Sequence, residues 1–117
     1  MYTEITLDKP RRLRFDLSAI QELEAALGSV PLGLVRAQIR QLGMTAIALS
    51  LWVGLKHEDR ALTRPLANRI LETYLTGGGS LVEVTQAILD AFDASGLFGV
   101  PGGSEGNAPA EPATTSR

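Results

Sequence analysis

Cysteine is absent from the chain, and the residues that most often carry catalysis are scarce. Without cysteine the protein has neither disulfide bonds nor thiolate metal ligands, and its absence fits a reducing compartment such as the cytoplasm. His57 is the single histidine, so any nucleophile–base pair would have to use it. We therefore expect no enzymatic activity, no cofactor and no bound metal.

An excess of positive charge and a long apolar run are also missing. The formal net charge is −2 and the pI about 5.3, whereas a non-specific nucleic-acid binder usually carries a basic excess. The longest apolar stretch, residues 46–55, is interrupted by Ser50 and is too short to cross a bilayer. The first residues do not resemble a secretory signal. We therefore expect a cytoplasmic protein with no nucleic-acid or membrane partner.

What the sequence does contain is a regular pattern of apolar residues. With 117 residues, 44% of them apolar, it can form one domain with one core. Alternation in residues 2–7 and 13–15, around a turn at residues 8–11, predicts a short hairpin. Spacings of three and four then predict five helices, beginning near residues 16, 31, 45, 63 and 80. The expected fold is mainly α: a single domain over residues 1–100 with an N-terminal β-hairpin, followed by a disordered tail at residues 101–117, which is rich in proline, glycine and small polar residues.

Local signals predict where these helices begin and end, and which helix is central. The apolar residues 46–55 should form the central helix, because almost every side of it is apolar. Leu42 and Leu66 fall on the expected buried stripes of the second and fourth helices. Capping side chains are expected at Asp16 or Ser18, Thr45, Thr63 and Ser80. Glycine stops are expected at Gly28, Gly43 and Gly96.

Three clusters of polar residues or glycines each allow a chemical and a structural interpretation. Residues 57–59 (His-Glu-Asp) could begin a metal site, but three consecutive side chains diverge, so we favour a solvated loop. Residues 77–80 (Gly-Gly-Gly-Ser) resemble a phosphate cradle without its lysine, and we favour a flexible connector with a serine cap. The arginines could bind an acidic protein or a nucleic acid, or form a solvated face balanced by nearby acids. They are Arg12, Arg14, Arg36 and Arg40.

Large apolar residues provide the candidates for partner binding. Trp52, the single tryptophan, could be a core residue or an interface anchor. Leu97 and Phe98 lie where the helical pattern gives way to the predicted tail, so they could complete the last helix or form an exposed docking element. We take Trp52, Leu97 and Phe98 as the candidate partner-binding residues.

Several motifs resemble those of a known family. They are residues 12–17 (Arg-Leu-Arg-Phe-Asp-Leu), the glutamate-containing residues 20–28, residues 51–55 (Leu-Trp-Val-Gly-Leu), the His-Glu-Asp loop at 57–59, Leu62-Thr63, and a helix closing at residues 87–92. Together they resemble the tail assembly chaperones of siphophages and gene transfer agents, over about residues 3–95.

This resemblance implies a non-enzymatic role. Chaperones of this family bind the long helical tape measure protein, keep it soluble, bring tail tube subunits to it, and are generally absent from the mature particle. The expected partners are therefore the tape measure protein and the tail tube protein. Because exposed apolar surface tends to be covered, we also expect a homo-oligomer when no client is present. A small helical nucleic-acid-binding regulator and a structural head–tail connector stay open as alternatives.

Overall fold

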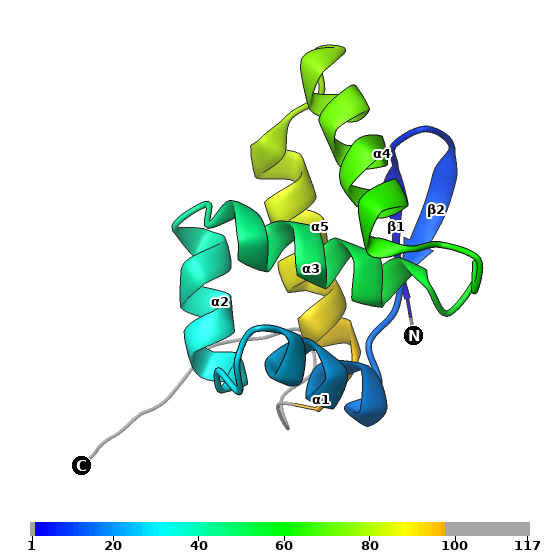
Figure 1. The fold of residues 1–117 in the computed structure, drawn as a ribbon. Coiled ribbons are helices and arrows are strands. Elements are labelled where there is room, and N and C mark those ends of the chain that lie inside the picture. Colours follow the sequence, from blue (N-terminus) through cyan, green and yellow to red (C-terminus); the bar gives the residue numbers. More distant parts are fainter. Residues whose placement is uncertain (1, 98–117) are drawn as a thin grey trace.

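The computed structural model describes residues 2–97, which form an antiparallel two-stranded hairpin followed by five helices (Figure 1). This confirms the mainly α fold with an N-terminal hairpin. The predicted tail at residues 101–117 lies outside the described residues. The elements are β1 (Thr3–Thr6), β2 (Pro10–Leu13), α1 (Leu17–Ala26), α2 (Leu32–Arg40), α3 (Met44–Leu55), α4 (Arg64–Thr76) and α5 (Leu81–Ala94).

The turn of the hairpin is shorter than predicted. Thr3 pairs with Leu13 and Thr6 with Pro10, so the connection comprises only residues 7–9. Pro10 and Arg11 therefore belong to β2, whereas the sequence placed them in the turn. Proline is tolerated here because it is the first residue of the strand, where its missing N–H removes little from the ladder.

Helix α3 lies at the centre of the molecule, as predicted. It contacts the other four helices and β2, and it crosses the middle of the fold in Figure 1. Eight of its 12 residues are buried, including Ile47, Leu51 and Leu55. Burying such a side chain contributes about 1.5–3 kcal/mol, so α3 organises the packing of the other elements.

Side-chain caps begin three of the five helices where the sequence predicted them. The carboxylate of Asp16 accepts a hydrogen bond from the Ala19 amide at 2.8 Å, which selects Asp16 over Ser18. The hydroxyls of Thr63 and Ser80 accept from the amides three residues later, at 3.3 and 3.2 Å. The predicted cap at Thr45 is wrong, because the N-cap of α3 lies two residues earlier, at Gly43, and makes no side-chain hydrogen bond.

The corner between α2 and α3 differs from the predicted glycine stop. Leu42, not Gly43, takes the left-handed conformation (φ +63°), and it is 42% exposed instead of buried. The Gly43 amide bonds to the Gln38 carbonyl at 2.8 Å, and the Leu42 amide to the Ile39 carbonyl at 2.9 Å. A Cβ atom on Gly43 would lie 3.0 Å from that Gln38 oxygen. Glycine at position 43 thus allows the backbone to come close to the Gln38 carbonyl. Because α3 begins directly after Gly43, the residue in the left-handed conformation is Leu42.

The hairpin packs on α3 at Gly54, where the helix carries no side chain. The Arg14 amide donates to the Gly54 carbonyl at 3.0 Å. A Cβ atom on Gly54 would lie 2.8 Å from the Phe15 ring and 2.9 Å from Leu13. Phe15 in turn packs on Phe92 of α5, with the ring centroids 4.7 Å apart. The glycine therefore allows the hairpin to reach the core.

We expect Gly54→Ala to lower the free energy of unfolding by about 1–3 kcal/mol, because the added methyl group overpacks this contact. Gly33→Ala in α2 is the matched control, since nothing lies within 4 Å of its added Cβ atom. The control should gain up to about 1 kcal/mol from helix propensity. Denaturant unfolding of the two variants measures both effects, and equal stability of Gly54→Ala and the wild type would contradict the packing described.

Candidate protein-binding surface

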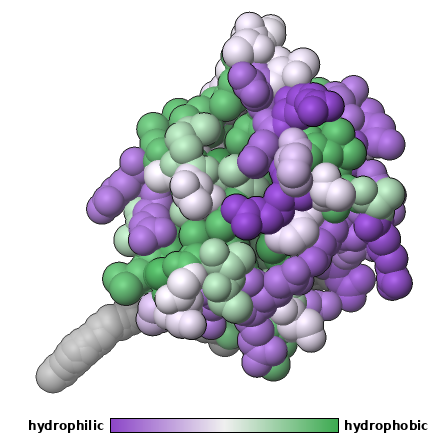
Figure 2. Space-filling view, in the orientation of Figure 1, coloured by the Kyte–Doolittle hydropathy of each residue, from purple (hydrophilic) through white to green (hydrophobic). Residues whose placement is uncertain are grey.

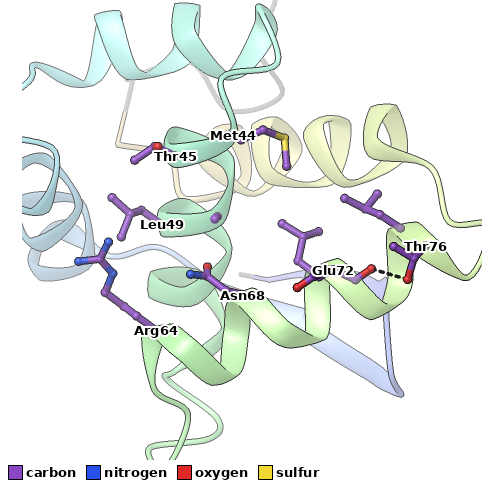
Figure 3. A pocket seen from close by; sticks show the side chains of 10 residues that line it. Met44, Thr45, Leu49, Arg64, Asn68, Glu72 and Thr76 are labelled. Atoms are coloured by element: carbon purple, nitrogen blue, oxygen red, sulfur yellow. Dashed lines mark hydrogen bonds between the residues drawn. The ribbon is translucent and has the colours of Figure 1, made fainter.

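An open groove of about 470 Å³ lies between α3 and α4. Leu49 and Leu71, both 3% exposed, and the half-buried Ala48 and Leu75 provide its apolar floor. Figure 3 shows Met44 at one end of α3, on the side of the groove toward Glu72 and Thr76, and Leu49 on the side toward Arg64. Such an apolar floor between polar walls suits the docking of an amphipathic helix.

The polar wall of this groove comes mainly from one face of α4. Arg64, Asn68, Glu72 and Thr76 recur every four residues and all line the groove. Within residues 2–97, the side chains of Arg64 and Glu72 have no hydrogen-bond or ion-pair partner in the chain. Eight residues of helix separate them by about 12 Å along the axis, too far for a mutual ion pair. The groove therefore has a positive and a negative end.

The three predicted partner-binding residues do not line this groove. Leu97 is 44% exposed and follows α5, and Phe98 lies outside the described residues. Trp52 is half-buried against the core; its indole N–H donates to the Leu62 carbonyl at 2.9 Å, and the Lys56 ammonium lies 4.4 Å from its ring centroid. Trp52 thus supports the loop before α4, while the roles of all three in partner binding stay predictions.

Other apolar side chains are also exposed, although the sequence placed them in the core or did not identify them as binding candidates. Leu66, predicted to be buried, is 40% exposed because Ala67 and Leu71 take the core positions of α4. Met44 is 48% exposed at the start of α3, since that helix begins earlier than predicted. Figure 2 shows much of the left half of one face as hydrophobic, while hydrophilic side chains dominate the right half. The only sequence signal for the exposure of Met44 was its place next to the predicted start of a helix.

The His-Glu-Asp loop is bound to β2 through all three of its side chains. His57 Nε2 lies 2.9 Å from the Arg12 carbonyl oxygen, and because a carbonyl only accepts, the imidazole donates. Glu58 pairs with the Arg12 guanidinium at 3.4 Å, and Asp59 with that of Arg11 at 3.7 Å. The motif therefore fastens the α3–α4 connection to the hairpin, a structural role that fits the loop interpretation.

Arg11 also holds Asp8 across the hairpin turn. Its guanidinium donates two hydrogen bonds to the Asp8 carboxylate, at 2.7 and 2.9 Å. These bonds lower the pKa of Asp8 below its usual value, and they raise the pKa of Arg11. The arginine thus joins the turn to the His-Glu-Asp loop.

The four arginines proposed as a basic patch are divided between different partners. Arg12 pairs with Glu58 and lies over the Tyr2 ring, 4.5 Å from its centroid. Arg36 of α2 pairs with Asp93 of α5 at 3.1 Å. Within the described residues, no hydrogen bond or ion pair of the Arg14 or Arg40 side chain is formed. Two of the four charges are therefore balanced inside the fold.

The glycine-rich loop uses its amides internally. Those of Gly77, Gly78 and Gly79 donate to the carbonyls of Thr73, Leu75 and Tyr74, and the Ser80 amide donates to the Tyr74 hydroxyl at 3.3 Å. A phosphate cradle needs such amides to point at the ligand. Their internal use favours the connector interpretation.

Within residues 2–97, no three His, Cys, Asp or Glu side chains gather closely enough to hold a metal ion. In the same part of the chain, no helix has the length and apolar character needed to span a membrane.

Comparison of the chain with protein-family models, curated protein sequences and solved structures finds no significant match. The family resemblance of the motifs stays a prediction.

We expect Trp52→Phe to cost about 1–2 kcal/mol of stability, because it leaves the Leu62 carbonyl without its donor. Leu97→Ala, at an exposed position, should change stability by less than about 0.5 kcal/mol. Thermal or denaturant unfolding compares the two. An unchanged stability of Trp52→Phe would mean that the indole does not support the loop.

The Asp8–Arg11 pair should make a small, pH-dependent contribution to stability. Because folding lowers the pKa of Asp8, the contribution is present above the carboxyl's unfolded pKa and is lost as pH falls through its folded pKa. Asp8→Asn should therefore cost at most about 1 kcal/mol at neutral pH, since solvent screens this 42% exposed carboxylate. The difference from wild type, measured by urea unfolding, should vanish in acid. A stability difference that persists in acid would mean that it does not come from the Asp8–Arg11 pair.

Proposed function

We propose that this protein is a non-enzymatic tail assembly chaperone of a phage or a gene transfer agent, which binds the tape measure protein in the host cytoplasm. The observation that carries the proposal is the open α3–α4 groove, with its apolar floor and its charged ends. A tape measure protein is long and helical, and a groove of this kind receives the apolar face of a helix. Tail tube subunits would join the complex after the client is bound.

The positions of the family-like motifs support the same proposal. Trp52 and the His-Glu-Asp loop both hold the connection that leads into α4, and α4 forms one wall of the groove. The residues that resemble the family thus maintain the surface that would bind the client. For the nucleic-acid alternative, the pairing of Arg12 with Glu58 and of Arg36 with Asp93 leaves less charge for phosphates.

Co-expression with the tape measure protein encoded beside this chain tests the proposal. We expect the client to stay soluble and to co-purify with the wild type. Met44→Asp should weaken binding at least about tenfold, because it places a charge at the end of the apolar groove. Leu34→Asp is the matched control: Leu34 is 58% exposed in the first turn of α2 and does not line the groove. Both aspartates suit a helix N-terminus, so both variants should fold.

Salt distinguishes the client from a nucleic acid. Apolar binding should persist or strengthen as salt rises, whereas binding to phosphates weakens by about 0.9 log unit per contact for each tenfold increase. A client that is equally soluble with and without this protein, and that does not co-purify, would refute the chaperone function. Equal binding by Met44→Asp and the wild type would remove the groove as the client site.

A further inference from the structure

The groove wall on α4 has a charge order that is complementary to itself. Arg64, Asn68 and Glu72 lie on one face of the helix, four residues apart. Their side chains are positively charged, neutral and negatively charged, in that order. If a second α4 runs antiparallel to the first across a two-fold axis at Asn68, each Arg64 lies opposite Glu72 of the partner subunit. A parallel arrangement would instead place like charges together.

We infer that a second copy of this chain covers the α3–α4 groove in the free protein, through two-fold packing of α4 against α4. Each groove then buries its apolar floor, and two Arg64–Glu72 pairs close its ends. The amide of Asn68 lies on the axis, and because an amide both donates and accepts, it can bond to its own copy. This contact satisfies charges that have no partner within the described part of the chain.

The exposed apolar surface favours the same occupant. Met44, 48% exposed, lies at the Glu72–Thr76 end of the groove, where the Arg64 end of a second α4 would cover it. In a two-fold dimer the same surface of each copy forms the contact, so the grooves of both copies are covered when the dimer forms. The inference concerns the chain alone and does not rest on the proposed client, because the dimer forms when no client is present.

Charge reversal tests the dimer directly. Sedimentation velocity of the full chain should show a concentration-dependent dimer for the wild type. Arg64→Glu and Glu72→Arg should each raise the dimer dissociation constant at least about tenfold, because each creates two repulsive pairs. Neither should unfold the protein, since a glutamate at the start of α4 and an arginine in its second half both suit the helix dipole. Circular dichroism checks this.

A mixture of the two variants gives the sharpest test. In the heterodimer both cross-axis pairs become attractive again, so an equimolar mixture should dimerise about as tightly as the wild type. Arg69→Glu is the control, since Arg69 is an exposed α4 residue that does not line the groove. It should dimerise like the wild type alone and should form no tight heterodimer with Glu72→Arg.

Three results would overturn the inference. They are a wild type that stays monomeric at the highest soluble concentration, a dimer that both reversals leave unchanged, and two weakened variants that the mixture does not restore. The second result would place the dimer contact on another surface. None of these measurements involves the tape measure protein, so the dimer and the client proposal can fail separately.

Discussion

Gly54 sets the distance between the hairpin and the central helix. A two-stranded ribbon is marginally stable in water by itself, so β1 and β2 depend on the surface on which they pack. Because α3 presents no side chain at residue 54, Leu13 and Phe15 can approach its backbone, and Phe15 reaches Phe92 of α5. The missing side chain at residue 54 thereby allows the hairpin to contact both the central helix and the last helix.

The position of α4 depends on the hairpin in turn. His57, Glu58 and Asp59 all bind β2, and Trp52 holds the Leu62 carbonyl just before the Thr63 cap. These contacts determine where the chain leaves the loop and where α4 begins. Helix α4 then packs on α3 through Ala67 and Leu71, while its Arg64–Glu72 face is left bordering the groove. The groove is thus a consequence of the hairpin contact, although no hairpin residue lines it.

A surface with this charge order can serve two occupants at different times. The proposed dimer and the proposed client would use the same apolar floor, so binding of one excludes the other. Such competition would keep an aggregation-prone groove covered until a client helix is available. Arg64 and Glu72 would then give the groove a direction, because a client helix binds best with an acidic residue near the first and a basic residue near the second.

Much of the fold follows from local patterns in the sequence. The apolar stripes predicted the five helices, the nearly all-apolar residues 46–55 predicted the central one, and Asp16, Thr63 and Ser80 cap helices as their side chains suggest. These features depend on residues within one or two turns of each other, so they can be inferred without a three-dimensional structure.

Only the tertiary structure decided how these elements meet. Leu42 is exposed because it takes the left-handed conformation at the corner before α3, and Leu66 is exposed because Ala67 and Leu71 take the core positions of α4. The binding of His57 to the Arg12 carbonyl joins residues 45 positions apart, and the packing of Gly54 on Phe15 joins residues 39 positions apart. The groove belongs to this second kind of feature. Leu49 and Leu71 in its floor are core residues at 3% exposure, and the angle and spacing of α3 and α4 decide that a groove lies over them, because packing between helices is set by side chains distant in the sequence.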